Sequence, residues 1–101
     1  MQKNKPLNAI MLDEHSTLTY TEVCAYLNIP EALLIEMQEQ GLFEVIVIQA
    51  TPCINQQAIS RIESACRLHQ HLGVNLPGVV LALELLDELQ ELRHRLAVLE
   101  R

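Results

Sequence analysis

Three cysteines and four histidines are the residues of this chain that could ligate a metal or act as nucleophiles. The cysteines are Cys24, Cys53 and Cys66. They are odd in number and no two have the C-x-x-C spacing, so we expect three reduced thiols. The histidines are His15, His69, His71 and His94. His69 and His71 are two residues apart and would point to different faces of a helix, so we expect no metal site and no cofactor.

The carboxylates do not indicate acid–base catalysis. Adjacent acids such as Asp13-Glu14 and Asp87-Glu88 stand in polar contexts, where solvated charges are expected rather than a tuned pair. The sequence has no G-x-S-x-G, H-E-x-x-H, Walker or G-x-G-x-x-G motif, and its three glycines stand where helices begin or end. We therefore interpret the chain as a non-enzyme, which leaves binding to nucleic acid, protein or a small ligand.

An acidic stretch is the strongest chemical feature of the chain. No Lys or Arg occurs between Pro6 and Ser60, and this stretch contains seven acids. They are Asp13, Glu14, Glu22, Glu31, Glu36, Glu39 and Glu44. DNA affinity depends on neutralising phosphates with Lys and Arg, so this stretch opposes DNA binding.

The elements that position these side chains are expected to be helical. The chain has 101 residues, the size of one domain, with 18 Leu, two Tyr, one Phe and no Trp, which favours an aliphatic core of packed helices. No apolar run is long enough to span a bilayer, and the start does not read as a signal peptide, so we expect a soluble cytoplasmic protein.

A helix-turn-helix is predicted near the N-terminal end. Thr19-Tyr20-Thr21-Glu22 fits a capping box and begins a helix through about Leu27, which Asn28-Ile29-Pro30 ends. A second helix is predicted from residue 31 to residue 40, ending at Gly41. Two short helices about a three-residue turn are typical of a helix-turn-helix.

A small β wing and two further helices should follow. Residues 42–48 are rich in β-branched residues and predict a strand that pairs with Cys53-Ile54 as a hairpin. Asn55 should cap a third helix reaching about Leu72. Residues 1–16 indicate no more than a strand or strap.

A last helix, opened by Asn75-Leu76-Pro77-Gly78, is predicted to continue to the C-terminus. Its later part narrows to a leucine seam with the 4, 3, 4, 3 spacing of a heptad. The seam consists of Leu85, Leu89, Leu92, Leu96 and Leu99. The seam could fold back on its own domain, but we favour a homodimeric coiled coil, parallel or antiparallel. The predicted organisation is an N-terminal extension (1–17), a winged helix-turn-helix-like domain (18–75) and a dimerisation helix (76–101).

This mainly α order of elements resembles the MerR-like winged helix-turn-helix superfamily over about residues 18–92. The resemblance is carried by Thr19-x-x-Glu22-Val23-Cys24, by Leu33-Leu34 through Gly41-Leu42-Phe43, and by residues 72–76, LGVNL. The residues that bind DNA are missing, because Ile35 stands in place of the recognition-helix Arg and Glu36 in place of the Tyr after it. The resemblance therefore implies the fold without implying the DNA-binding chemistry.

Residues 67–79, RLHQHLGVNLPGV, followed by residues 82–89, ALELLDEL, are similar to the chaperone modulator CbpM family. Leu76 departs from the family pattern, where an aromatic residue is common, and the N-terminal extension is longer than usual. The resemblance implies binding to the J-domain of CbpA, a DnaJ-like, nucleoid-associated co-chaperone, and restraint of its partnership with DnaK. A J-domain carries a basic helix, which an acidic helix-turn-helix would suit.

The second helix should carry the docking face, because Glu31, Ile35 and Glu39 recur at i, i+4 while Leu34 and Met37 turn to the core. We predict the partner-binding residues to be Glu31, Ile35, Glu36 and Glu39, with Glu22 and Glu44 in second place. A simple solubilising acidic surface is the alternative for any one of these residues, and the partner could instead bind across the dimer helix. A MerR-type DNA-binding regulator would need Arg61, Arg67 and the N-terminal lysines to form one basic face, and an acidic anti-repressor would fit the same charges.

Overall fold

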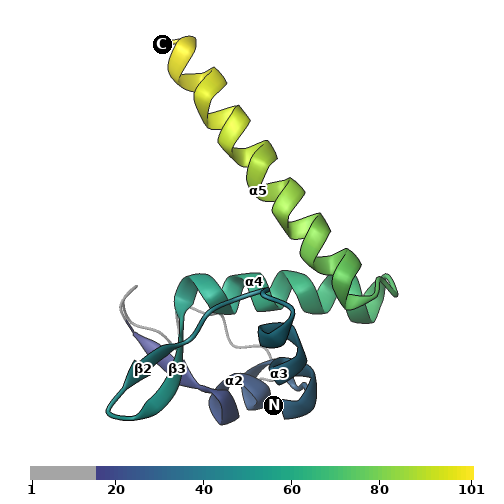
Figure 1. Cartoon of the computed structure of the whole chain (residues 1–101). Helices are drawn as coiled ribbons and strands as arrows, with labels where there is room; N and C mark the ends of the chain where they lie inside the picture. The colour runs from purple at the N-terminus through teal and green to yellow at the C-terminus, as the bar shows by residue number, and fades with distance from the viewer. Residues whose placement is uncertain (1–15) are drawn as a thin grey trace.

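Short helices and a small sheet form a domain from which one long helix projects (Figure 1). The computed structural model describes residues 16–101. In chain order the elements are β1 (Thr17–Thr19), α2 (Tyr20–Leu27), α3 (Glu31–Glu39), β2 (Ile46–Ile48), β3 (Thr51–Asn55), α4 (Gln56–Cys66), the π-helical turn η1 (Arg67–His71) and α5 (Leu76–Leu99). The predicted mainly α, winged helix-turn-helix architecture is confirmed.

The helix-turn-helix has the predicted local chemistry. The Thr19 hydroxyl accepts from the Glu22 amide over 3.2 Å, and the Glu22 carboxylate accepts from the Thr19 amide over 2.9 Å. This capping box satisfies backbone donors that the first turn of α2 leaves without a helical partner. α3 ends one residue earlier than predicted, and Gly41 follows with φ +81°, a left-handed conformation that favours glycine.

The sheet has the order β1-β3-β2 and is antiparallel throughout. The predicted hairpin is present, but the strand predicted over residues 42–48 is wrong at its start, because β2 begins only at Ile46. Leu42 and Phe43 are 1% and 5% exposed, because their side chains pack in the core. These two residues therefore precede the strand and do not pair in it. β1 adds a third strand, and Thr17, which we assigned to the N-terminal extension, pairs with Asn55.

The β2–β3 hairpin turns through two residues with positive φ, Gln49 at 51° and Ala50 at 65°. A two-residue turn of this hand matches the twist of the strands but favours Asn and Gly. Gln and Ala adopt the left-handed region at a higher conformational free energy than Asn and Gly do. The turn therefore carries a local conformational cost.

α4 lies across the domain and its apolar face closes the core. Asn55 caps it as predicted, its side chain accepting from the Ala58 amide over 2.9 Å. The helix predicted to reach about Leu72 is α-helical to Cys66 and continues without a break as the π-helical turn η1 to His71. The largest fully buried side chains between these elements are Val23, Leu34, Met37, Leu42, Ile54, Ile59, Ile62 and Val79.

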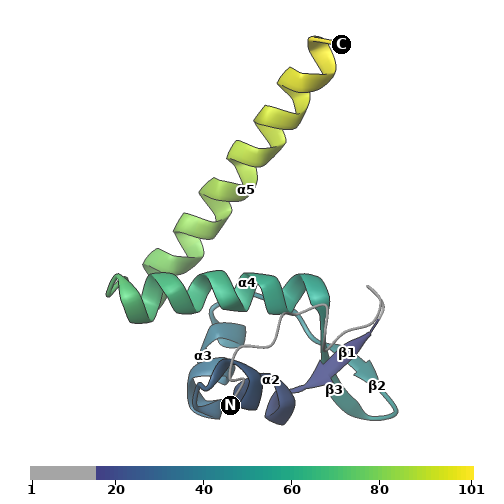
Figure 2. The ribbon, with the colours of Figure 1, turned by 180° about the vertical axis from the view of Figure 1, so that it is seen from behind.

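α5 begins on the domain and then leaves it (Figure 2). Asn75 accepts from the Gly78 amide over 2.8 Å, and a Cβ at Gly78 would lie 2.9 Å from Val74 Cγ1, so the first turn needs glycine there. Leu76, Val79 and Leu83 are buried against the domain, whereas every residue from 84 to 101 is exposed. The tertiary packing of α5 is thus confined to its first two turns.

Candidate partner-binding surfaces

α3 presents the predicted docking face to solvent. Leu34 and Met37 are completely buried and fix the inner side of the helix, as the periodicity predicted. The outer side carries four exposed residues, which we call the acidic α3 surface: Glu31, Ile35, Glu36 and Glu39. Ile35 lies in the middle of this surface and is 41% exposed, so an apolar residue is surrounded by carboxylates.

Within the part of the chain that the structure describes, no cation pairs with a carboxylate of the acidic α3 surface. Within residues 16–101 the ion pairs are Arg61–Asp87 and Arg95–Glu91, and neither includes a carboxylate of α3. No Lys or Arg occurs in the sequence from residue 16 to residue 60, so the helix-turn-helix and the wing contain none. The surface therefore has a negative field that favours a basic partner.

A shallow groove of about 430 Å³ lies between α3 and the wing, beside this surface. Glu31, Ile35 and Gln38 line it from α3, and Val45 and Pro52 line it from the wing. Gln38 is held at the edge by the Tyr20 hydroxyl, which donates to its Oε1. The groove was not predicted, because it joins residues that are about 15 positions apart in the sequence.

Glu22 and Glu44, the two partner-binding residues that we predicted in second place, lie outside the acidic α3 surface. Glu22 is exposed but its carboxylate accepts from the Thr19 amide in the capping box. Glu44 follows α3 in a loop and lines a separate groove with Leu42 and Arg61. The structure thus groups the four residues of α3 and leaves Glu22 and Glu44 outside that group.

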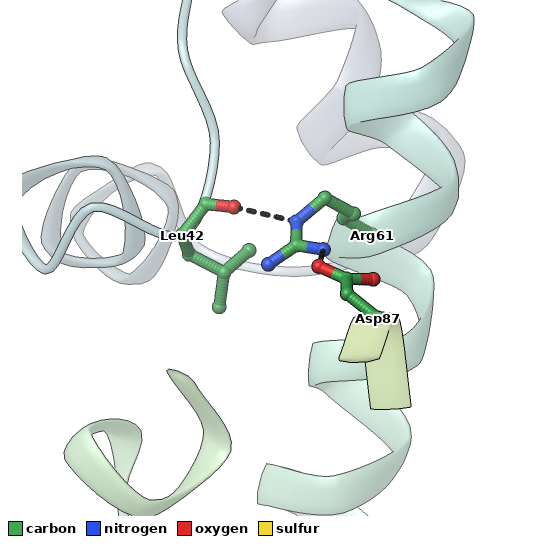
Figure 3. A network of polar contacts seen from close by, with 3 residues as sticks. All are labelled: Leu42, Arg61 and Asp87. Carbon is green, nitrogen blue, oxygen red and sulfur yellow. Dashed lines mark hydrogen bonds and ion pairs between the residues drawn. The ribbon is translucent and has the colours of Figure 1, made fainter. Parts of the chain in front are cut away.

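Arg61 forms a polar network that connects three elements (Figure 3). Its Nε donates to the carbonyl oxygen of Leu42 over 2.9 Å, and its Nη1 donates to Asp87 Oδ2 over 2.7 Å. Arg67, six residues on, instead donates to the Ser64 hydroxyl over 3.2 Å and lines a different groove. Arg61 and Arg67 do not form the continuous basic face that a DNA-binding regulator would need, and the N-terminal lysines lie outside the described residues.

The leucine seam of α5 is exposed along its whole length. Leu85, Leu89, Leu92, Leu96 and Leu99 are between 43% and 82% exposed. At 100° per residue, the seam lies on the side of α5 opposite to Leu76, Val79 and Leu83, which face the domain. Leu81, 56% exposed, extends this side toward the N-terminal end of the helix. The seam does not fold back on its own domain within residues 16–101.

Cys24, Cys53 and Cys66 are free thiols. Cys53 is buried, whereas Cys24 and Cys66 are partly buried. Burial, with a smaller contribution from Glu63, raises the pKa of the Cys66 thiol to about 11, so this thiol stays protonated and unreactive at neutral pH. No group of three metal-ligating side chains occurs among the described residues, and His15 lies outside them.

No helix within residues 16–101 is long and apolar enough to cross a bilayer.

Comparison with known proteins agrees with this geometry. Residues 18–101 match the family described as MerR HTH family regulatory protein. The chaperone modulatory protein CbpM of Coxiella burnetii is 29% identical over 96 residues, which cover 94% of this chain and 91% of that protein. The chaperone modulatory protein CbpM of Escherichia coli O1:K1 is 33% identical over 78 residues, which cover 76% of this chain and 77% of that protein. The match over residues 18–101 includes the helix-turn-helix, the wing and the long last helix of this chain. The chain belongs to the chaperone modulatory protein CbpM family, within the MerR-type helix-turn-helix proteins.

Proposed function

We propose that this chain is a cytoplasmic, non-enzymatic adaptor that binds the J-domain of a DnaJ-like co-chaperone, CbpA, and restrains its stimulation of Hsp70. The named relatives are chaperone modulatory proteins, which supports a role in chaperone modulation. The acidic α3 surface supports a basic partner, and a basic helix is what a J-domain offers to Hsp70. Covering that helix would block the stimulation and could also alter DNA binding by the co-chaperone.

The observation that carries the proposal is the chemistry of α3. In a DNA-binding helix-turn-helix the second helix enters the major groove, and its side chains meet phosphates and base edges. Here that helix carries three carboxylates around an exposed Ile35, and none of them has a cationic partner among residues 16–101. Such a helix is repelled by a duplex and attracted by a basic protein surface, for which charge complementarity gives fast and specific association.

We further propose that the chain forms a homodimer through the leucine seam of α5. Residues 84–101 are all exposed, and their only polar side-chain contact with the domain within the described residues is the ion pair of Asp87 with Arg61. An isolated helix of this length is marginally stable in water, and its exposed leucines lie on one side. A second copy of the chain would cover the seam and leave the acidic α3 surface free, since Leu76, Val79 and Leu83 hold the domain on the opposite side of α5.

The test is the ATPase activity of Hsp70 stimulated by the J-domain, measured with increasing amounts of the chain. We expect the stimulation to fall with the unmodified chain and to recover when salt is raised, because screening weakens the attraction. Glu36→Arg should inhibit much less. Glu84→Arg, a charge reversal at an exposed site on α5, is the matched control and should inhibit like the unmodified chain.

Three results would contradict or redirect the proposal. Unchanged stimulation at low salt, with no J-domain binding, would contradict it. A specific shift of a DNA duplex by the chain would favour a MerR-type regulator, and capture of a transcription regulator in place of the J-domain would favour an acidic anti-repressor.

A further inference from the structure

The wing of this chain has an unusual surface for a winged helix-turn-helix. Residues 45–54 contain no charged side chain, and Ile46, Val47 and Ile48 are 44%, 67% and 44% exposed. The hairpin extends beyond the helices of the domain (Figure 2). A wing that contacted DNA would need cationic side chains, whereas this one presents aliphatic side chains to solvent.

The strand register separates the exposed side chains into two faces. Val47 pairs with Pro52, and Ile54, two residues after Pro52, is completely buried in the core. Side chains alternate along a strand, so Val47 and Pro52 share one face of the hairpin with the buried Ile54. Cys53, which pairs with Ile46 on the other face, is also buried. Ile46 and Ile48 project from the other face.

This face of the wing continues into the groove beside α3. Pro52 and Val45 line the groove from the wing, and Ile35 lines it from α3. Val47 pairs with Pro52 across the hairpin and is 67% exposed, beside this lining but outside it. The α3 side of the groove carries Glu31 and Ile35, and the wing side carries Val45, Thr51 and Pro52. Glu36 and Glu39 are exposed on the same helix outside this lining.

From this arrangement we infer that the groove between α3 and the wing is the docking site for an amphipathic basic helix. The basic side of that helix lies along the acidic α3 surface, and its apolar side contacts Ile35, Pro52 and Val47. This inference rests on the proposed function and identifies which helix of the partner binds and how it is oriented. Two chemically different borders on one groove specify orientation, which charge alone does not.

The two borders should respond differently to salt. Contacts at the wing are apolar and are screened little, whereas contacts at α3 are ionic and weaken as salt rises. The test measures the affinity of the full chain for a fluorescently labelled J-domain by anisotropy, at low and at high salt. The variants are Val47→Ser and Val47→Thr on the groove face, with Ile48→Ser as the matched control on the opposite face.

We expect Val47→Ser to weaken binding about tenfold at both salt concentrations, as expected for removing an aliphatic side chain from an interface. Val47→Thr, which keeps the β-branched shape that suits the strand, should also weaken binding, and Ile48→Ser should change it less than about twofold. Thermal melts of the variants should match that of the unmodified chain, because Val47 is largely exposed.

Four results would overturn the inference. Normal binding by both Val47 variants would exclude the wing while leaving J-domain binding intact. Equal losses for Val47→Ser and Ile48→Ser would indicate a general effect on the hairpin and not a groove contact. A change in the oligomeric state with Val47→Ser would mean that a second copy occupies the groove. If the unmodified chain fails to bind the J-domain, the proposed function fails together with the inference.

Discussion

Arg61 of α4 and Asp87 of α5 form an ion pair of 2.7 Å at the point where the long helix leaves the domain (Figure 3). The same guanidinium donates to the carbonyl oxygen of Leu42, which directly follows the Gly41 turn after α3. One side chain thus connects the end of the helix-turn-helix to the helix that carries the leucine seam. Arg61 therefore helps to fix the direction of α5 relative to the acidic α3 surface.

We predict that Arg61→Ala lowers the free energy of unfolding by about 1–2 kcal/mol. Most of this loss comes from the charged hydrogen bond to Leu42, because the pairing with Asp87, whose side chain is 59% exposed, is screened by solvent. Urea unfolding at a fixed protein concentration measures the change. Arg67→Ala, at an exposed arginine, is the control and should cost less than about 0.5 kcal/mol. Equal stability of the Arg61 variant and the control would refute the proposed role.

Thr19→Ala should destabilise the domain by about 1 kcal/mol, since it removes one half of the capping box of α2. Thr21→Ala changes the same residue type two positions later, inside the helix and exposed, where alanine has the better helix propensity. Thermal melts of the two variants compare these effects on the stability of the domain. A loss for Thr21→Ala as large as that for Thr19→Ala would show that the cap contributes nothing specific.

Ala50→Gly should stabilise the hairpin, because Ala50 has a φ of 65° that glycine adopts without cost. We expect a gain of about 0.5 kcal/mol in the free energy of unfolding. Ala32→Gly is the control, for which we expect the opposite sign. Ala32 lies exposed in α3, where glycine is expected to lower the free energy of unfolding by about 1 kcal/mol. Chemical denaturation of both variants tests the pair, and a loss of stability for Ala50→Gly would contradict the prediction.

Leu92→Asp should abolish the proposed homodimer. A carboxylate in the middle of the seam would be buried without a partner in a coiled coil, whereas in a monomer it would be solvated. Light scattering after gel filtration should give about twice 11.5 kDa for the unmodified chain and about 11.5 kDa for the variant. Val98→Asp, at an exposed position off the seam, should remain dimeric. A mass of one chain for the unmodified protein at all concentrations would exclude the dimer.

Stability should fall in alkaline solution through Cys66. Its folded pKa of about 11 lies above the ordinary value of 9.0, so the folded chain holds the thiol proton more tightly than the unfolded chain does. The contribution is complete below pH 9 and is lost as the pH rises toward 11, by roughly 1–2 kcal/mol after allowance for partial exposure. Urea unfolding in reductant should show a shallower decline between pH 9 and 11 for Cys66→Ala. Parallel declines would refute the linkage.

The parts of the fold that the sequence predicted well are those set by local chemistry. The caps at Thr19, Asn55 and Asn75 occur as predicted, because a side chain that accepts from an amide three residues later needs no distant partner. The inner and outer sides of α3 also follow from periodicity alone. The leucine seam of α5 is likewise a local pattern, because its heptad spacing can be read from the sequence alone.

The parts that the sequence did not predict depend on contacts between distant residues. The strand expected from residue 42 is shortened because Leu42 and Phe43 are needed in the core, which β propensity cannot indicate. Arg61 meets a carbonyl 19 residues before it and a carboxylate 26 residues after it. The groove beside α3 likewise could not be predicted, because it forms only when the wing lies beside α3 in the folded domain.

The most direct test of the account is isothermal titration of the unmodified chain with the isolated J-domain of the co-chaperone from the same organism, at low and high salt. The account predicts saturable binding that weakens as salt rises and weakens further in Glu36→Arg, because the acidic α3 surface supplies the attraction. Glu84→Arg should bind like the unmodified chain. Absence of binding at low salt, or binding that neither salt nor Glu36→Arg changes, would contradict the claim that this surface receives the J-domain.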